Sequence, residues 1–505
     1  MKKRIFSILL CCVMLAGLLP MVALAEGGVS YLDENGYEQT CTSATEVTSD
    51  DTGWGTSGET TWYVVQGTVT IGSRVTVSGD VRLILTDGCT LTVNGGIQVQ
   101  DDDGDITNGS ANALTIYGQS VPVLNEDGTV AESNTAGKLT ANSTDETNDT
   151  NAAIGGNGDD DYGGSGGAIT VNGGCVEAES YDGAGIGGGD GDDYGGSGGT
   201  ITINGGCVKA SSTFGAAIGG GDSASSGGSG GTITINGGTI TATSTVNGAG
   251  IGGGGSAGAG GDGGEITING GTVTANGGNG AAIGGGYGGG TGGSGGKITI
   301  TGGTVNATAT GTYSGAGIGG GYGVGSGYGV GSGTFSTGTN GNAVIFASSI
   351  ADKSNQSSWS GIIFEGNADG IIYGKSVAPT DDFTIPTGKT LTIPSGVTMT
   401  VNSTITVNGT LANNGTIIGS GSITPEEKKL TYKEFPGAPV IDSVSADSIT
   451  LRPITGETAV EYSKDNTNWQ SETTFSGLTA ATSYTFYARY QANGFYKGAS
   501  PQSGG

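Results

Sequence analysis

Short stretches of the chain alternate between apolar and polar residues with a period of two. Residues 232–235 (TITI) and 239–242 (TITA) are a representative pair, separated by an Asn-Gly-Gly turn. This alternation predicts two β-strands with Ile233, Ile235 and Ile240 facing a core and the threonines facing outward. One such pair is too small to bury its apolar face, so the pattern predicts that several copies pack together.

The strand pairs belong to an internal repeat. An A-(A/G)-I-G-G motif recurs at spacings of 32, 32, 33, 32 and 35 residues, with its isoleucine at Ile154, Ile186, Ile218, Ile251, Ile283 and Ile318. An I-T-(V/I)-(N/T)-G-G motif follows each of the first five, with its polar residue at Asn172, Asn204, Asn236, Asn269 and Thr301. Periods of this length are typical of solenoid proteins.

Stacking the repeats explains both the alternation and the spacing. Successive turns about 4.8 Å apart would satisfy the backbone along the axis and align like residues inside. We therefore predict an all-β chain whose main part is a right-handed parallel β-helix, a solenoid with about three short sheets per turn. Similar segments flank the repeats and predict further, tighter coils at 68–71, 74–77, 82–85, 90–93, 390–393, 398–401 and 404–407.

Glycine makes up 108 of the 505 residues, about three times its usual share. The glycines come in clusters, which excludes the every-third-residue pattern of collagen. A flexible Gly-rich linker is the alternative interpretation. Because Ile and Val stay in phase between the clusters, we interpret most glycines as corners and loops of the coils.

Composition changes near Pro425, and alternating segments follow at 440–444, 448–451, 460–463 and 483–490. Residues 478–484 (LTAATSY) resemble the fibronectin type III pattern L-x-P-x-T-x-Y, with Ala480 in place of Pro. The resemblance implies a small β-sandwich in which Tyr484 is the tyrosine-corner residue and Trp469 a core aromatic. The expected last strand after Pro501 is missing, so the chain is a fragment or the module lacks its closing edge.

Residues 1–25 have the features of a secretory signal peptide: a basic KKR start, an apolar run and an Ala-Leu-Ala cleavage site. An uncleaved anchor is the alternative. We expect an extracellular protein, secreted or surface-associated, with no membrane insertion after cleavage. The expected organisation is a signal peptide over 1–25, a lead-in or cap over 26–60, N-terminal coils over 61–150, the Gly-rich array over 151–335, C-terminal coils over 336–424, a linker over 425–438 and the sandwich over 439–505.

The charged residues exclude several classes of function. The chain has 18 Lys and Arg, 46 Asp and Glu and no His, for a net charge of −28. Catalysis and zinc binding through His are excluded, and the negative charge argues against nucleic acid as a partner. A polysaccharide lyase would need a basic residue beside an acidic groove. We expect Arg74 and Arg82 to lie far from the acidic loops, and Lys209 and Lys297 to lack neighbouring acids.

Two loops of the array are strongly acidic. Residues 155–163 (GGNGDDDYG) match the calcium-binding nonapeptide G-G-x-G-x-D-x-U-x, and 188–194 (GGDGDDY) match it imperfectly. Stacked coils would bring the loops together, and several carboxylates suit calcium. Solvated acidic loops are the alternative. The candidate calcium ligands are Asp159, Asp160, Asp161, Asp190, Asp192 and Asp193.

Tyrosines recur in the same loops, at Tyr162, Tyr194, Tyr287 and Tyr322. Stacked along the solenoid, they would form a strip for sugar rings or a partner protein, and packing over the neighbouring glycines is the alternative. The Gly-rich coils, such as ITINGGTVTA, resemble those of secreted Gram-positive β-helix proteins, including carbohydrate-binding ones with calcium sites. The resemblance implies a polysaccharide, or a glycan or protein of a cell surface, as partner.

Four cysteines follow the signal peptide, and two of them occupy equivalent repeat positions. In register, Cys175 and Cys207 would lie about 4.8 Å apart on adjacent coils, within the Cα range of a disulfide. We predict this disulfide, with both residues facing outward, against two unpaired thiols as the alternative. The pairing of Cys41 and Cys89 stays open. The sequence as a whole predicts non-catalytic adhesion or carbohydrate binding, then a structural surface stalk, and third a polysaccharide lyase.

Overall fold

The computed structural model describes residues 28–99, 112–125, 131–144, 150–159, 161–325, 327–328, 331, 333–424, 439–454, 460–465 and 467–490. The predicted signal peptide and linker lie outside these residues. Two compact units can be distinguished, residues 1–359 with 363–367 and residues 360–362 with 368–505. No helix in the described part of the chain is long and apolar enough to cross a bilayer.

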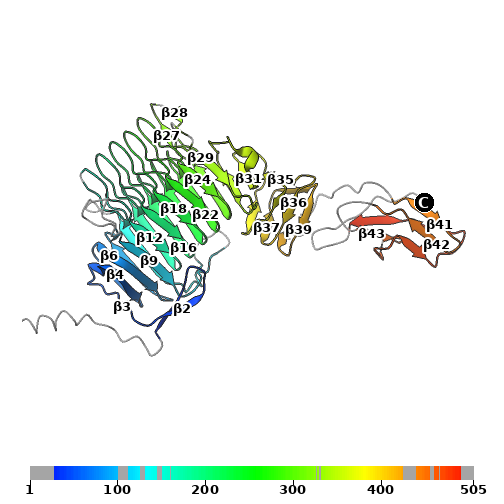
Figure 1. Cartoon of the computed structure of the whole chain (residues 1–505), viewed down its shortest axis with the longest axis horizontal. Helices are drawn as coiled ribbons and strands as arrows, with labels where there is room; N and C mark the ends of the chain where they lie inside the picture. The colour runs from blue at the N-terminus through cyan, green and yellow to red at the C-terminus, as the bar shows by residue number, and fades with distance from the viewer. Residues whose placement is uncertain are drawn as a thin grey trace, which may run out of the picture. The chain divides into compact units, whose positions relative to one another are not determined.

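Each coil of the repeat array contributes three strands, and each strand pairs in parallel with its equivalents in neighbouring coils (Figure 1). The shortest strands are β11 (Ile154–Gly155), β14 (Ile186–Gly187), β17 (Ile218–Gly219), β20 (Ile251–Gly252), β23 (Ile283–Gly284) and β26 (Ile318–Gly319). The second set is β12 (Ala168–Val171), β15 (Thr200–Ile203), β18 (Thr232–Ile235), β21 (Glu265–Ile268), β24 (Lys297–Ile300) and β29 (Thr334–Thr337). The third is β13 (Cys175–Ser180), β16 (Cys207–Ser212), β19 (Thr239–Ser244), β22 (Thr272–Gly277), β25 (Thr304–Ala309) and β30 (Val344–Ala347). The parallel β-helix predicted from the repeat is therefore confirmed.

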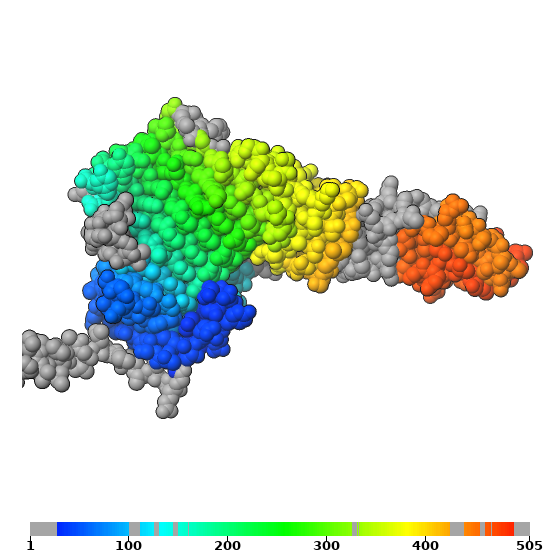
Figure 2. Space-filling view, viewed as in Figure 1, coloured from blue at the N-terminus to red at the C-terminus, as the bar shows by residue number. Residues whose placement is uncertain are grey.

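The strand register aligns identical residues into buried columns. Ile201, Ile233, Ile266 and Ile298 pair in succession, and each is at most 1% exposed. The isoleucines of the A-(A/G)-I-G-G motif form a second fully buried column. Each buried isoleucine contributes roughly 1.5–3 kcal/mol of apolar burial, so the columns supply most of the driving force for stacking. Figure 2 shows the outer surface of these coils, which is continuous from one coil to the next.

Glycine closes the corner after each short strand. Gly219 has φ of 140°, a backbone conformation that residues with a side chain rarely adopt. A Cβ atom placed on Gly219 would also overlap the carbonyl oxygen of Gly252 on the next coil. Two independent constraints therefore require glycine at this corner.

The polar residue of the second motif forms a ladder of side-chain hydrogen bonds. Asn204 donates to the Oδ1 of Asn172 at 2.7 Å, and Asn236 donates to the Oδ1 of Asn204 at 2.7 Å. Asn269 continues the ladder at 2.9 Å, and the hydroxyl of Thr301 donates to its Oδ1 at 2.7 Å. Each asparagine thus donates to the side-chain oxygen of the asparagine one coil before it. Threonine can end the ladder because its hydroxyl is also a donor.

The N-terminal lead-in and coils differ in detail from the sequence prediction. Their strands are β1 (Val29–Leu32), β2 (Glu38–Cys41), β3 (Thr45–Glu46), β4 (Gly53–Val65), β5 (Thr68–Ile71), β6 (Val75–Leu85), β7 (Thr90–Asn94), β8 (Ile97–Gln98), β9 (Ala113–Gly118) and β10 (Lys138–Ser143). The segments 74–77 and 82–85, predicted as separate strands, join into β6. Strand β6 pairs with the long strand β4 on both sides of the join, and the irregularity in their register lies on β4, between Gly55 and Thr60.

Short elements lie within the last coil of the array and after it. The hairpin β27 (Tyr322–Gly323) and β28 (Gly327–Tyr328) is antiparallel, and η1 (Gln356–Ser358) is a single 3-10 turn. Strands β31 (Gly361–Glu365) and β32 (Ile371–Tyr373) come next in the chain.

The tighter C-terminal coils predicted at 390–407 are present, and all of their strand pairs are parallel. They form three ladders: β33 (Ser376–Val377), β36 (Thr398–Thr400) and β39 (Thr416–Ile418); β34 (Phe383–Ile385), β37 (Thr404–Val407) and β40 (Ser422–Thr424); and β35 (Thr390–Ile393) with β38 (Thr410–Asn413).

The last described segment is a small antiparallel β-sandwich. One sheet contains β41 (Ile441–Val444), β42 (Ser448–Leu451) and β44 (Thr474–Ser476), and the other contains β43 (Val460–Ser463) and β45 (Tyr487–Tyr490). Its core consists of Leu451, Tyr462, Phe475, Leu478, Phe486 and Ala488. The backbone N–H of Thr479 donates to the hydroxyl of Tyr484 at 2.8 Å, the contact expected of a tyrosine corner. Trp469, predicted as a core aromatic, is only half-buried, and Tyr462 and the two phenylalanines fill the core instead.

Candidate functional site

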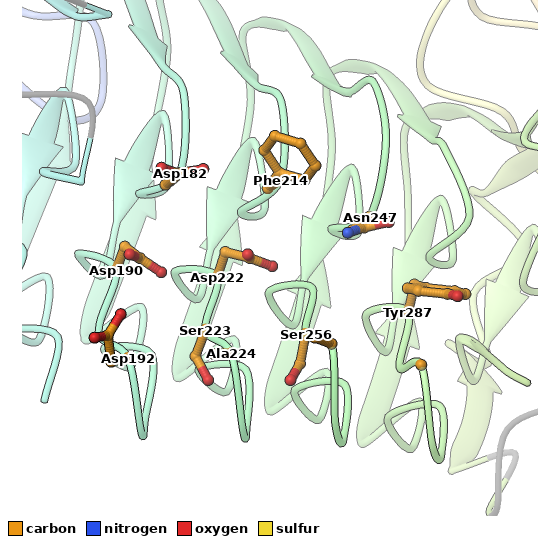
Figure 3. Close-up of a pocket in the computed structure, with 12 residues that line it drawn as sticks. Asp182, Asp190, Asp192, Phe214, Asp222, Ser223, Ala224, Asn247, Ser256 and Tyr287 are labelled. Carbon is orange, nitrogen blue, oxygen red and sulfur yellow. The ribbon is translucent and has the colours of Figure 1, made fainter. Parts of the chain in front are cut away.

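The loops of the array border a shallow, open hollow of about 650 Å³ that extends over four successive coils (Figure 3). Its walls are about equally polar and apolar, and two aromatic rings contribute to them. The lining residues are Asp182, Asp190, Asp192, Phe214, Asp222, Ser223, Ala224, Asn247, Ser256, Ala257, Tyr287 and Gly289.

The lining residues follow the repeat and form columns along the axis. In three successive coils, the residue four positions before the isoleucine of the A-(A/G)-I-G-G motif is Asp182, Phe214 and Asn247. The position four residues after it is Asp190, Asp222, Gly255 and Tyr287 in turn. Figure 3 shows both columns as parallel rows of side chains, because stacked coils place equivalent residues side by side.

Small residues in one column leave room for the hollow. This lower column carries only small residues beyond Asp192, namely Ala224, Ala257 and Gly289. Gly255, in the column of Asp222 and Tyr287, is instead closely packed, because a Cβ atom there would lie 2.3 Å from the Cβ of Asn247 and 2.7 Å from Oδ1 of Asp222.

Asp222 is a strongly perturbed carboxyl group of the hollow. Burial, followed by the negative charges of Asp190 and Asp182, raises the pKa of Asp222 to about 8. The backbone N–H of Ser223 bonds the carboxyl group and partly offsets this effect. The Oδ1 atom of Asp222 is buried and has no hydrogen-bond partner. An unpaired buried acceptor is costly, most of all when the carboxyl group is charged, which agrees with the raised pKa.

The predicted calcium ligands do not gather into one site in the described residues. The two acidic loops stack as expected, since the Asp159 amide donates to the Asp190 carbonyl at 3.2 Å and the Asp193 amide to the Asp161 carbonyl at 3.0 Å. Asp160 lies outside the described residues. Across the described chain, no group of three or more His, Cys, Asp or Glu side chains is placed to share a metal ion. Of the predicted aspartates, Asp190 and Asp192 line the hollow.

The four predicted tyrosines form two pairs, and the continuous strip that we predicted is not present. Tyr162 and Tyr194 stack with ring centroids 5.3 Å apart and planes 4° from parallel, and both are more than half exposed. Tyr287 and Tyr322 stack at 6.5 Å and 5° in a different column. Only Tyr287 lines the hollow. The pairs are separated because Ser226, Ala259 and Thr291 continue the column of Tyr162 and Tyr194.

The two repeat cysteines are adjacent, as predicted. Cys175 pairs in register with Cys207 on the neighbouring strand, and its thiol donates a hydrogen bond to the Cys207 sulfur, which raises the pKa of Cys175. Both are thiols in the structure, as are Cys41 and Cys89. Cys175 lies on the side of β13 that carries Glu177 and Glu179, opposite the buried Val176, but it is only 5% exposed because Asn134 lies against its sulfur.

The basic residues have different surroundings from those predicted. Arg74 is not remote from the acidic loops, because its guanidinium donates to Oδ1 of Asn157 at 2.7 Å and to the carbonyl of Gly156 at 3.0 Å. It also donates to the carbonyls of Gly95 and Ala152. Arg74 therefore ties the first acidic loop to the N-terminal coils.

The predicted absence of acids beside the repeat lysines is also wrong. Lys209 forms an ion pair with Glu177 at 3.2 Å, and Lys297 pairs with Glu265 at 2.6 Å. In both pairs the partners occupy equivalent positions on adjacent coils, a relationship that the repeat spacing already contained. Arg82 pairs with Asp80 and lies over the ring of Trp62.

The sequence prediction missed Asp182, Phe214 and Asn247 as members of one site. Asp222 was visible as an isolated acid, but its neighbours follow only when the chain is aligned on the repeat. Asp190 and Asp222 are 32 residues apart, one full coil. That spacing was the available signal.

Comparison with known proteins is consistent with this geometry. The Beta helix repeat family matches the chain at residues 169–190, 201–222, 233–255, 266–287 and 298–322. No curated protein and no solved structure matches the chain. Each matched segment begins in a four-residue strand and ends in the loop that borders the next coil. The chain is thus a parallel β-helix protein with five β-helix repeats in its array.

Proposed function

We propose that this chain is an exported, non-catalytic protein that binds carbohydrate in the hollow of the repeat array. The observation that carries the proposal is the lining of the hollow. Carboxylates, the amide of Asn247 and the hydroxyls of Ser223 and Ser256 surround a space that Phe214 and Tyr287 also border. Sugar hydroxyls need such acceptors and donors, and sugar rings pack well on aromatic surfaces.

The basic residues support binding over catalysis. None of the described residues that line the hollow is Lys or Arg. Arg74 is engaged by backbone carbonyls, and Lys209 and Lys297 are paired with glutamates on the face of a sheet. A lyase would need a base that can reach the bound sugar. The polysaccharide lyase therefore stays the least favoured hypothesis.

Export and location follow from the sequence. The signal-like residues 1–25 support secretion, and an acidic, Gly-rich solenoid suits a soluble or surface-associated protein outside the cell. A fibronectin type III-like module, supported by the Tyr484 contact, would serve as a spacer or protein-contact domain. Adhesion to a glycan-bearing surface combines these features.

The test is a glycan array followed by calorimetry on the full chain. Ala257→Trp places a large side chain at an exposed position of the hollow and is expected to abolish binding without disturbing the core. Tyr162→Ala, which removes an exposed ring outside the hollow, is the matched control and should bind normally. Equal loss in both variants, or no bound glycan at all, would reject the proposal.

A structural stalk is the second candidate, and the ladders favour it. The asparagine ladder and the buried isoleucine columns repeat without interruption over the array. Such regularity stiffens a rod whether or not a ligand binds. If no glycan on the glycan array binds and the intact chain is displayed at the cell surface, this alternative is favoured.

A further inference from the structure

Cys175 and Cys207 are a pair of thiols that the proposed function does not use. They face each other in register on β13 and β16, at about the 4.8 Å spacing of adjacent strands. This spacing lies within the Cα range of a disulfide, so the two sulfurs are close enough to bond to each other. The pair can therefore act in one reaction.

The two thiols differ in how far solvent reaches them. Cys175 is 5% exposed, and the side-chain amide of Asn134 donates to its sulfur at 3.9 Å. Cys207 is partly exposed, and its neighbour on the other side is the small residue Thr239 on β19. A small molecule that approaches from solvent therefore meets the sulfur of Cys207 first.

The hydrogen bond between the two thiols also favours Cys207 as the nucleophile. This bond lowers the pKa of Cys207, against the opposing effects of burial and of the Glu177 carboxylate. Lys138 and Lys209 lower the pKa of Cys207 as well. The thiolate is the reactive form of cysteine, and reactive cysteines are typically partly exposed and close to positive charge. Access and ionisation thus favour the same sulfur of the pair.

Thiol–disulfide exchange explains the pair better than a structural zinc site does. Structural zinc takes four protein ligands in tetrahedral geometry. Within the described ranges of the chain, no group of three or more His, Cys, Asp or Glu side chains is placed to share a metal ion. Two adjacent thiols of unequal access are sufficient for exchange, because one sulfur can react with a disulfide and the other can then displace the product.

We propose that Cys207 and Cys175 form a thiol–disulfide exchange site, at which Cys207 reacts with small disulfides and Cys175 resolves the mixed disulfide. The Cys207 thiolate attacks one sulfur of a disulfide R–S–S–R, which breaks the S–S bond and releases one RS⁻. Cys175 then gives its proton to solvent, attacks the Cys207 sulfur and releases the second RS⁻. Both RS⁻ groups take up protons. The cysteine pair thus loses two electrons and becomes a disulfide, and the small disulfide is reduced to two thiols.

The first step of this reaction prepares the second. The hydrogen bond to Cys207 is the largest cause of the raised pKa of Cys175, followed by burial. A sulfur in a mixed disulfide carries no charge, so the proton of Cys175 is no longer held by a thiolate acceptor and Cys175 ionises more readily. Lys138 and the amide of Asn134 favour the Cys175 thiolate. The mixed disulfide should therefore be short-lived in the parent chain.

The test uses the full chain, reduced beforehand, with bis(2-hydroxyethyl) disulfide as the probe. The probe is neutral, so the net charge of −28 does not repel it. Samples are quenched with acid at intervals, alkylated and mapped by mass spectrometry. Cys175→Ser should accumulate the mixed disulfide at Cys207 at least about tenfold faster than Cys207→Ser accumulates it at Cys175. The parent chain should form the Cys175–Cys207 disulfide, with the mixed disulfide at Cys207 as a transient species.

Two comparisons separate an exchange site from a merely accessible cysteine. Cys175→Ala removes the hydrogen bond to Cys207, whereas the hydroxyl introduced by Cys175→Ser is still a donor. Alkylation of Cys207 should therefore need a higher pH in Cys175→Ala than in Cys175→Ser. Cys41 and Cys89 are buried and should remain thiols in every variant. Melting curves of all variants establish that they are folded before the rates are compared.

Three results would contradict the exchange site. Equal rates of mixed-disulfide formation in Cys175→Ser and Cys207→Ser would overturn the division of roles. Stable mixed disulfides on both cysteines of the parent chain, without the cross-link, would overturn resolution by Cys175. The same pH profile of Cys207 alkylation in Cys175→Ser and Cys175→Ala would overturn activation by Cys175. None of these results bears on carbohydrate binding, which the glycan array tests separately.

Discussion

Asp190 stands one coil before Asp222 in the same column of the array, and the two carboxyl groups share one hollow. After burial itself, the charge of Asp190 is the largest cause of the raised pKa of Asp222, which reaches about 8. Repetition thus creates an electrostatic conflict, because the stacking that aligns like residues also aligns like charges. Protonation of Asp222 relieves the repulsion, because its raised pKa leaves the carboxyl group mostly uncharged near neutral pH.

The first prediction concerns the pH dependence of stability. Between the ordinary Asp pKa near 4 and the folded pKa of about 8, the folded state holds a proton on Asp222 that the unfolded state has lost. Stability should therefore fall as pH rises through this window, by up to about 1.4 kcal/mol per pH unit from this group. Asp222→Asn should remove this contribution. The variant should therefore gain more melting temperature over the parent chain at pH 8 than at pH 5.

Denaturant unfolding of both proteins at the two pH values measures this effect. Glu179→Gln, which removes an exposed carboxylate, should retain the pH slope of the parent chain. Parallel slopes for the parent and Asp222→Asn would show that Asp222 ionises normally in the folded protein.

The second prediction concerns the asparagine ladder. Asn236 donates to Asn204 at 2.7 Å and accepts from Asn269 at 2.9 Å, so Asn236→Ala breaks two hydrogen bonds. At about 0.5–1.5 kcal/mol each, the loss should lower the free energy of unfolding by about 1–3 kcal/mol. Asn236→Thr should cost less, because a hydroxyl can both donate and accept, and Thr301 already bonds the ladder in this way. Equal destabilisation by both variants would mean that the ladder itself contributes little.

The β-helix was predictable because its information is local and repeated. The spacing of Ile201, Ile233 and Ile266 sets both the length of a coil and the residues that meet across coils. An error in assigning the strands of one copy does not change the assignment of the others. The period of two within strands and the period of about 32 residues between coils were therefore enough to predict the fold. The long strand β6 was missed because its pairing with β4 depends on a segment outside the repeat.

The hollow was harder to predict because it depends on what the coils lack. A motif search finds aspartates, but the open space of the hollow comes from the small residues of the lower column, Ala224, Ala257 and Gly289. The contact of Arg74 with Asn157 is of the same kind, since it joins residues 83 positions apart without a shared motif. Such contacts follow only from the three-dimensional stacking, whereas the lysine–glutamate pairs could have been found by aligning the repeats.

The third prediction tests the glycine corners. Gly219→Ala adds a side chain at φ of 140° and brings it against the carbonyl of Gly252. We expect the free energy of unfolding to fall by more than the about 1–2 kcal/mol that left-handed backbone strain alone would cost. Gly67→Ala, with φ of 63° and open space around it, should show the strain without the clash. Gly72→Ala, which has neither constraint, should be close to neutral in urea unfolding. A similar loss of unfolding free energy for the Gly219 and Gly67 variants would show that the contact with the Gly252 carbonyl contributes nothing.

The last prediction concerns the two stacked cysteines. Cys175 and Cys207 pair in register on adjacent parallel strands, at a spacing that a disulfide tolerates. In an oxidising compartment we expect them to form a disulfide that closes a loop of one coil, for which chain entropy predicts about 3–4 kcal/mol of stabilisation. Peptide mapping of protein exported by a bacterial host should show the cross-linked peptide, and reduction should lower its melting temperature. Cys175→Ser with Cys207→Ser should abolish this response to reductant, whereas Cys89→Ser should preserve it. Complete alkylation of Cys175 and Cys207 in the exported protein, without prior reduction, would show that the pair persists as thiols.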